Sequence, residues 1–344
     1  MTTKVIRIDA SSPDATAIGE AAEIITRGGL VAFPTETVYG LGADATDEAA
    51  AKKIYSAKGR PSDNPLIIHV SHPEDAERYA HTSELYYKLA QAFMPGPLTV
   101  ILPKKETIPS SVTGGLDSVA VRCPSHPIAL ALISAAGVAI AAPSANLSGS
   151  PSPTCADHVI SDLGGRVDMI IDGGESEIGL ESTIVKLDGD SLTLLRPGAI
   201  TCDALNCVCE KVNVAAAVTE KLGEDERPLS PGMKYRHYAP SAPLVLLDGS
   251  DEDTLEYMIK MRAQQSCAVI CYDEELPFLS GDMVISIGAR NDLEAQASSL
   301  FAALRIADKF SADIIYAHLP PQCGIGLALY NRMIRAAAHT IKKV

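Results

Sequence analysis

The sequence has no tryptophan, only 5 phenylalanines, and no apolar run long enough to cross a membrane. The N-terminal segment MTTKVIRIDA lacks the charged and then apolar pattern of a secretory signal. No C-x-x-C pair occurs among the eight cysteines, and the spacing of Cys202, Cys207 and Cys209 fits no common zinc site. We therefore expect a cytoplasmic protein with no membrane segment, no metal-ligating residues of its own, and buried, reduced thiols.

Positive charge is also scarce. The chain has 29 lysines and arginines against 43 acidic residues, which gives a formal net charge of -14. Proteins that bind nucleic acid usually have a basic surface, because neutralising phosphates supplies most of the affinity. The acidic balance argues against an extensive direct nucleic-acid surface and favours a small anionic ligand held locally. An RNA-binding module is the alternative, and failure to bind RNA at any salt concentration would exclude it.

Several sequence signatures of catalysis and nucleotide binding are missing. There is no P-loop, and Gly324-Ile325-Gly326 lacks the third glycine of a dinucleotide fingerprint, so we interpret it as a tight turn. No Ser-His-Asp or Cys-His arrangement is visible, and no internal repeat was found. The sequence therefore predicts no organic cofactor and no covalent nucleophile, and any ATP must be bound by another kind of site.

The length of 344 residues suits two domains, and a hydrophobic content of 47% is ample for packed cores. We predict a catalytic domain over 1–212, a linker over 213–242 and a C-terminal domain over 243–344. In the first domain, we predict strands at 4–9, 30–33, 66–70, 98–102, 119–122, 138–142, 167–171, 184–187 and 192–195, and helices at 14–27, 47–59, 73–93, 128–136 and 201–212. The last two strands are expected to form a hairpin.

The C-terminal domain has strands alternating with helices. We predict strands at 244–247, 268–271, 284–287 and 313–317, and helices at 252–264, 293–310 and 327–342. This alternation predicts an α/β domain with a parallel, doubly wound sheet.

Polar side chains gather in the stretch 28–70. The predicted strand 30–33 leads directly into Thr35-Glu36-Thr37, and hydroxyls with a carboxylate at a strand end are typical of a small-molecule pocket. Lys58 and Arg60 then flank a turn, and cations placed this close suit a polyphosphate. Taken singly, Lys58 is more often a solvated cation at a helix end, and His69 in an apolar strand is more often a core histidine.

A second polar loop, Pro143 to Ser152, follows the predicted strand 138–142 and repeats the geometry of the first. An ordinary Ser/Pro turn is the alternative interpretation.

The segment SPGMKYRHYAP, at 230–240, is unusually aromatic and basic for an interdomain linker. It is either a strap packed against one domain or a lid over a phosphate pocket, and we favour the lid.

These stretches closely resemble the YrdC-like family, and with the linker and second domain they resemble its threonylcarbamoyl-AMP synthases that carry an extra C-terminal domain. The resemblance implies a YrdC-like twisted mixed sheet with flanking helices, plus a smaller C-terminal Rossmann-like parallel α/β domain. Members of the family join L-threonine, bicarbonate and ATP into threonylcarbamoyl-AMP and pyrophosphate, which feeds t6A modification of tRNA. A different carbamoyl- or acyl-adenylate enzyme, as in hydrogenase-maturation relatives, is the alternative, but those relatives lack this linker and C-terminal domain.

The resemblance also assigns residues. Lys58 and Arg60 are implied to be catalytic through electrostatic stabilisation, with Mg²⁺ accompanying ATP. The implied ATP-binding set is Arg60, Asn64, Ser118, Ser144, Asn146, Ser152, Arg196, Tyr235 and His237. The implied threonine-binding set is Thr37, His69, Arg122, the backbone of Ala142, and Ser182. The expected partners are the three substrates and the downstream machinery that transfers the threonylcarbamoyl group to tRNA.

Overall fold

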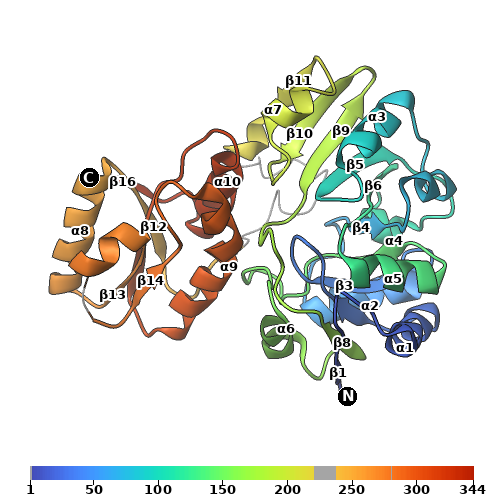
Figure 1. The fold of residues 1–344 in the computed structure, drawn as a ribbon, viewed down its shortest axis with the longest axis horizontal. Coiled ribbons are helices and arrows are strands. Elements are labelled where there is room, and N and C mark those ends of the chain that lie inside the picture. The colour runs from blue at the N-terminus through green and yellow to red at the C-terminus, as the bar shows by residue number, and fades with distance from the viewer. Residues whose placement is uncertain (1, 221–237, 280) are drawn as a thin grey trace. The chain divides into compact units, whose positions relative to one another are not determined.

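The computed structural model describes residues 2–220, 238–279 and 281–344, which form two compact units (Figure 1). The described part of the first unit covers 2–148 and 152–220, and that of the second covers 149–151, 238–279 and 281–344. Among these residues, no helix has both the length and the apolar character needed to cross a membrane. All eight cysteines are free thiols, but only four of them are buried, so the expectation of buried thiols holds for half of the set.

The first unit is built on an 11-stranded sheet with the order β1-β8-β2-β3-β7-β4-β6-β5-β9-β10-β11. Its strands are β1 (Lys4–Arg7), β2 (Val31–Phe33), β3 (Gly40–Asp44), β4 (Ile67–His69), β5 (Leu98–Pro103), β6 (Ser118–Arg122), β7 (Ile140–Ala141), β8 (Met169–Asp172), β9 (Thr183–Asp188), β10 (Ser191–Arg196) and β11 (Val212–Val214). Parallel pairs such as β4 with β6 occur beside antiparallel pairs such as β5 with β6. The mixed sheet is therefore confirmed, and so is the hairpin of β9 and β10.

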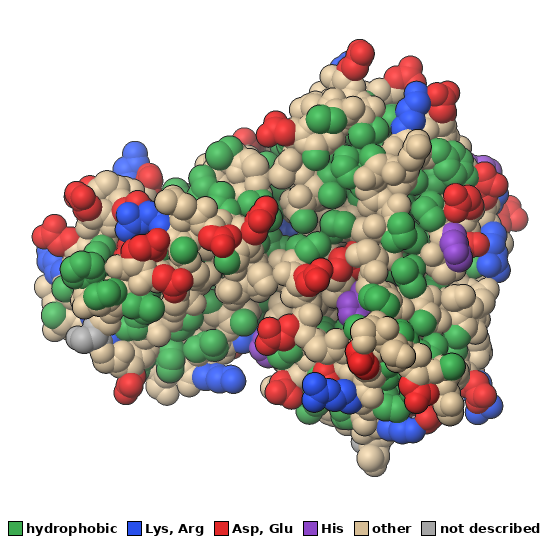
Figure 2. All heavy atoms as spheres, in the orientation of Figure 1, with side chains coloured by type: hydrophobic (Ala, Val, Ile, Leu, Met, Phe, Trp, Pro, Cys, Tyr) green, Lys and Arg blue, Asp and Glu red, His purple; other side chains and the backbone are tan. Residues whose placement is uncertain are grey.

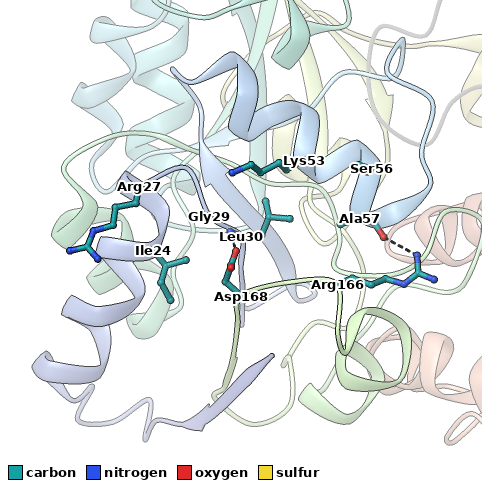
Figure 3. Close-up of a pocket in the computed structure, with 9 residues that line it drawn as sticks. All are labelled: Ile24, Arg27, Gly29, Leu30, Lys53, Ser56, Ala57, Arg166 and Asp168. Atoms are coloured by element: carbon teal, nitrogen blue, oxygen red, sulfur yellow. Dashed lines mark hydrogen bonds between the residues drawn. The ribbon is translucent and has the colours of Figure 1, made fainter. Parts of the chain in front are cut away.

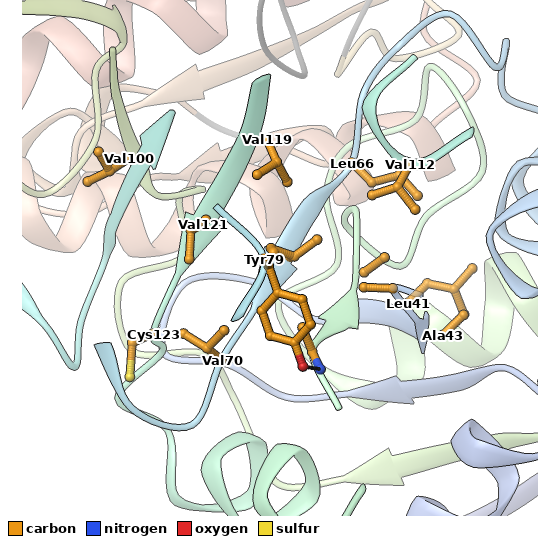
Figure 4. Close-up of a cluster of buried hydrophobic side chains, with 14 of the residues drawn as sticks. Leu41, Ala43, Leu66, Val70, Tyr79, Val100, Val112, Val119, Val121 and Cys123 are labelled. Carbon is orange, nitrogen blue, oxygen red and sulfur yellow. Dashed lines mark hydrogen bonds between the residues drawn. The ribbon is translucent and has the colours of Figure 1, made fainter. Parts of the chain in front are cut away.

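Helices cover both faces of this sheet. They are α1 (Ala15–Thr26), α2 (Glu48–Lys58), α3 (Glu84–Phe93), α4 (Ser110–Thr113), α5 (Pro127–Ala136), α6 (Ala156–Leu163) and α7 (Cys202–Asn206), with 3₁₀ turns η1 (Pro73–Arg78) and η2 (Ala216–Val218). Alternate residues of β2 point to opposite faces, as strand geometry requires. Val31 and Phe33 pack with α1 and α5, whereas Ala32 lies in a larger core with α2, α3 and α6. Part of that larger core is drawn in Figure 4.

Helix α2 positions one of the predicted cations. It begins after Asp47, whose carboxylate accepts a hydrogen bond of 2.7 Å from the backbone N–H of Ala49. It ends at Gly59, which adopts the left-handed conformation (φ 61°) that glycine takes without steric cost. Lys58 is thus the last helical residue, and its buried position contradicts the alternative of a solvated cation.

Two predicted helices of the first unit are wrong in extent. The segment 73–93 is interrupted, because Ala80 bridges to Lys104 and the N–H of His81 bonds to the carbonyl of Pro103. The segment 201–212 is helical only in α7, because Val212 leaves to pair with Leu192 of the neighbouring hairpin. Strand β3 and helix α6 were not predicted. Strand β3 pairs with both β2 and β7.

The second unit holds a five-stranded sheet in the order β14-β13-β15-β12-β16, and every pairing in it is parallel. Its elements are β12 (Leu244–Asp248), α8 (Asp251–Gln264), β13 (Cys267–Cys271), η3 (Asp273–Phe278), β14 (Val284–Ser286), α9 (Leu293–Lys309), β15 (Ile314–His318), α10 (Gly326–Ala336) and β16 (Ile341–Lys343). The predicted parallel α/β domain is confirmed. The helix predicted to 342 is wrong beyond Ala336, because Ala338 and His339 adopt positive φ and turn the chain into β16.

Candidate active site

Three polar side chains form a row across neighbouring strands of the first unit. His69 at the end of β4 pairs with Arg122 at the end of β6, and Arg122 pairs in turn with Thr99 of β5. Directly paired residues on adjacent strands project to the same face of a sheet. All three side chains are buried, so the row lies within the unit and away from bulk water.

Arg122 is held by a carboxylate from the loop after β2. Its Nη2 lies 2.8 Å from Oε1 of Glu36, and both side chains are 5% exposed. Its Nε also donates to the carbonyl of Gly96 at 3.4 Å. Burial by itself raises the pKa of Glu36, but the charge and hydrogen bond of Arg122 outweigh it, and the net pKa is lowered. The pair therefore stays ionised at neutral pH.

His69 is a neutral imidazole in this row. Its complete burial, followed by the positive charge of Arg122, lowers its pKa to about 3. Nδ1 lies 3.3 Å from the carbonyl of Ile140, so this nitrogen carries the proton of the neutral ring. Nε2 is then the acceptor nitrogen of the neutral ring.

A second cluster of polar groups surrounds Ser182, just before β9. Its hydroxyl lies 2.7 Å from Oγ1 of Thr99 and accepts a hydrogen bond of 3.1 Å from Nη2 of Arg196. Arg196 also donates through Nε to the carbonyl of Ser182 at 3.0 Å. The neighbouring residue Glu181 accepts a hydrogen bond of 2.5 Å from the hydroxyl of Ser152. Thr99 thus connects this cluster to the row of Arg122.

The second predicted loop meets the end of α2. Nζ of Lys58 donates to the carbonyls of Ser144 and Asn146, both at 2.5 Å, and lies 3.3 Å from Oδ1 of Asn146. The hydroxyl of Ser144 donates to the same Oδ1 at 2.5 Å. Ser144 bridges to Gly40 at the start of β3, which fixes the loop on the sheet. The structure therefore brings Lys58, Ser144 and Asn146 together.

Arg60 and Asn64 lie on the loop between α2 and β4. Nη2 of Arg60 donates to the carbonyls of Asn64 and Pro65 at 3.1 and 2.9 Å. Asn64 is buried, and its side-chain carbonyl has no hydrogen-bond partner among the described residues. Ser118 begins β6, where Ala120 pairs with Ile67 of β4, so Ser118 lies at the same end of these strands as Asn64. This end is the opposite one from His69 and Arg122.

Of the remaining predicted residues, some lie near the row of His69 and Arg122 and others lie outside the described part of the chain. The backbone N–H of Ala142 bonds to the carbonyl of Ile67, two residues before His69, and Thr37 directly follows Glu36. Tyr235 and His237 lie outside the described residues. Thr99 and Glu181 received no role from the sequence, and Glu36 was placed in a pocket without a ligand or partner. The Thr35-Glu36-Thr37 motif gave the signal for Glu36, whereas Thr99 sits inside an apolar strand pattern that gives none.

The surface agrees with the acidic composition. On the face drawn in Figure 2, acidic side chains are scattered among isolated lysines and arginines.

A separate cavity of about 660 Å³ in the first unit is drawn in Figure 3, lined by Ile24, Arg27, Gly29, Leu30, Lys53, Ser56, Ala57, Arg166 and Asp168. Two of its cations bond to backbone carbonyls, Lys53 to Gly28 at 2.5 Å and Arg166 to Ala57 at 3.4 Å. None of the predicted site residues lines this cavity.

Comparison with known proteins covers both units. The Sua5/YciO/YrdC family model, described as telomere recombination, matches residues 23–198, and the model of the threonylcarbamoyl-AMP synthase C-terminal domain matches residues 200–338. The chain is 46% identical to threonylcarbamoyl-AMP synthase of Bacillus subtilis, over 93% of this chain and 92% of that protein. It is also 46% identical to threonylcarbamoyl-AMP synthase of Pyrococcus abyssi, over 94% of this chain and 95% of that protein.

A solved structure shares the fold. The crystal structure of P. abyssi Sua5 complexed with L-threonine superposes with a TM-score of 0.91 at 43% identity, covering 99% of this chain and 100% of that chain. The relative in that structure binds L-threonine.

Proposed function

Because this chain belongs to the Sua5/YciO/YrdC family and has the C-terminal domain of threonylcarbamoyl-AMP synthases, we propose that it is an L-threonylcarbamoyladenylate synthase. It makes threonylcarbamoyl-AMP and pyrophosphate from L-threonine, bicarbonate and ATP, for t6A modification of tRNA. In chemical class it is a nucleotidyltransferase, because an adenylyl group moves to a carboxylate. One observation carries the proposal: Ser182, assigned to threonine, is hydrogen-bonded to Arg196, assigned to ATP.

The amino acid is proposed to bind along the buried row. Arg122 pairs with its carboxylate, since a guanidinium recognises carboxylates in a fork. His69, neutral because of its low pKa, accepts a hydrogen bond from threonine, and Ser182 donates or accepts beside it. Thr37 and the backbone of Ala142 complete the set. Placing the amine beside bicarbonate in this dry site favours the N-carboxy intermediate by proximity.

ATP is proposed to bind where Lys58 meets the Ser144 loop. The N-carboxy group attacks the α-phosphorus, and pyrophosphate leaves. Lys58 and Arg60 stabilise the charge that develops on the phosphates. The further contacts proposed for ATP are Asn64, Ser118, Ser144, Asn146, Ser152, Arg196, Tyr235 and His237.

Mg²⁺ is proposed to arrive with ATP. Across residues 2–220, 238–279 and 281–344, no group of three or more His, Cys, Asp or Glu side chains is arranged to hold a metal ion. This arrangement fits a magnesium ion that keeps its waters and is bound mainly by substrate phosphates. When bound, the ion neutralises phosphate charge. The expected location is the cytoplasm, where the product passes to the machinery that modifies tRNA.

Two experiments test the proposal, identification of the product and substitution of Arg60. Mass spectrometry of a reaction containing threonine, bicarbonate and ATP is expected to detect threonylcarbamoyl-AMP, with other amino acids giving little product. Arg60→Ala is expected to lower pyrophosphate release by at least about 100-fold, the scale of losing one preorganised charge contact. Arg27→Ala, which changes an exposed arginine paired with Glu23, is the matched control and should retain activity. Unchanged turnover in a folded Arg60→Ala protein would remove Arg60 from the mechanism.

A further inference from the structure

We infer that Glu36 and Arg122 together form a receptor for the zwitterionic head of the amino acid, in which Arg122 faces the carboxylate and Glu36 compensates the ammonium. Glu36 is then a specificity-determining residue that selects an α-amino acid over an anionic acid of the same shape. This inference rests on the proposed function, because it assumes that Arg122 binds the substrate carboxylate.

The backbone around Glu36 is fixed by bonds that do not involve the ligand. Oγ1 of Thr35 donates to the carbonyl of Val38 at 2.6 Å, which closes the turn after β2. The carbonyl of Glu36 accepts a hydrogen bond of 2.9 Å from the N–H of Ile178. The carboxylate is therefore held in place beside Arg122 before any substrate enters.

The carboxylate retains capacity for a donor. Apart from Arg122, the donors near it are the backbone N–H groups of Glu36 itself and of Ser125, which help to lower its pKa. Oε1 is paired with Nη2 of Arg122 at 2.8 Å, whereas Oε2 makes no well-aligned hydrogen bond within the described part of the chain, and both oxygens are buried. A buried charged acceptor of this kind is costly unless a donor completes it. An ammonium group would supply that donor.

The charge balance favours a zwitterion. Glu36 and Arg122 cancel, and His69 is neutral, so the row has no net charge before substrate binds. A zwitterion leaves that balance unchanged, whereas a monoanion adds an uncompensated negative charge in a site that is nearly inaccessible to solvent. The next charged side chains along the row, Arg196 and Glu181, are of opposite sign and do not change this sum.

A competing explanation is that Glu36 only orients Arg122. The two explanations differ in what happens to ligands that share the carboxylate but lack the ammonium. If Glu36 only orients the guanidinium, its loss weakens every carboxylate ligand by the same factor. If Glu36 compensates the ammonium, its loss weakens threonine selectively.

Calorimetric titration without ATP separates these explanations. The ligands are L-threonine and the 2,3-dihydroxybutanoate of matching configuration, in which a hydroxyl replaces the ammonium. We expect the wild-type protein to bind threonine at least tenfold more tightly than the hydroxy acid. In Glu36→Gln, which keeps the shape and removes the charge, we expect threonine affinity to fall at least tenfold while hydroxy-acid affinity is unchanged or rises. Glu36→Asp retains the charge and should retain the preference.

Glu177→Gln is the matched control, because Glu177 is exposed and directly precedes Ile178, and both affinities should remain at wild-type values. Equal losses for both ligands in Glu36→Gln would overturn the inference. If that variant does not fold, the wild-type comparison decides, because equal binding of threonine and the hydroxy acid would also overturn it. Failure of the wild-type protein to bind threonine at all would overturn the proposed function as well.

Discussion

At the scale of single residues, Arg122 determines the electrostatics of the site. It keeps Glu36 ionised through a 2.8 Å ion pair, and together with burial it keeps His69 neutral. Arg122 therefore sets the protonation of Glu36, whereas burial is the larger cause of the neutral imidazole of His69. Removing it would leave Glu36 as a buried, unpaired charge, a change that typically costs 3 to 5 kcal/mol, so we do not expect Arg122 variants to separate folding from binding.

His69 gives a pH prediction with a definite sign. Its pKa is about 3 in the folded protein, whereas an unfolded histidine titrates near 6.5. Below pH 6.5 the unfolded chain therefore binds a proton that the folded one does not, and stability falls as the pH is lowered toward 3. The slope from this group approaches about 1.4 kcal/mol per pH unit. Urea unfolding between pH 6.5 and 4.5 should show a pH dependence of stability that is shallower in His69→Gln than in the wild-type protein by up to this amount.

The control for this prediction is His72→Gln, which changes an exposed histidine close by in the sequence. That variant should keep the wild-type slope. In the lower part of this window, carboxyl groups with a lowered folded pKa such as Glu36 also contribute to the slope, because they take up protons near 4.5 in the unfolded chain, but they do so equally in the wild-type protein and in both variants. Parallel pH profiles for His69→Gln and the wild-type protein would contradict the buried, neutral imidazole.

At the scale of elements, helix α2 shows how a terminus places a functional group. Its left-handed end at Gly59 directs the chain toward Arg60, while Lys58 in the last turn reaches the carbonyls of the Ser144 loop. A positive φ costs an alanine about 1 kcal/mol, whereas glycine adopts it freely. The end of α2 therefore depends on the identity of residue 59.

Two glycine-to-alanine substitutions test the role of the positive φ at residue 59, and we expect them to change the free energy of unfolding in opposite directions. A Cβ at Gly59 would meet nothing within 4 Å, so Gly59→Ala should destabilise by about 1 kcal/mol through φ alone. Gly19 lies inside α1, also with nothing within 4 Å, and there Gly19→Ala should stabilise by about 0.5 to 1 kcal/mol because alanine favours the helix. Denaturant unfolding gives both values. Stabilisation by Gly59→Ala would contradict a φ-dependent helix end.

At the scale of the whole molecule, only one of the two units contributes described residues to the site. All of the site residues that the structure describes lie in the first unit, which has its own cores on both faces of its sheet. The second unit is a separate parallel sheet with its own core. We therefore expect the first unit to fold alone, because a chain of its size can bury a sufficient core.

A chain ending just before Ser230 tests this expectation. It should unfold cooperatively, since the buried hydrophobic clusters of the first unit are all retained. It should form much less threonylcarbamoyl-AMP, because the proposed ATP contacts Tyr235 and His237 are removed. Circular dichroism melting and mass spectrometry of the product provide the two measurements, with the full-length chain as the control. Full activity of the shortened chain would show that the segment 230–240 has only a structural role.

The sequence determined most of the elements and suggested where polar groups meet strand ends. The apolar run 30–33 before Thr35-Glu36-Thr37 and the short strand ending at Arg122 indicated polar groups at strand ends, whereas the assignments of Thr37 and His69 came from the family resemblance. Alternation of strands and helices was sufficient to identify the C-terminal parallel sheet. The limits of 73–93 and 201–212 could not be obtained this way, because distant strands compete locally for these backbones.

The tertiary structure decided which residues meet. Arg122 lies 86 positions after Glu36 in the chain, and only the order β4-β6-β5 sets Arg122 between His69 and Thr99. Pairing between non-consecutive strands depends on how the whole sheet buries its two faces, which no local pattern encodes. The ionisation of the site was decided in the same way, because a pKa depends on burial and on the charges that folding brings near.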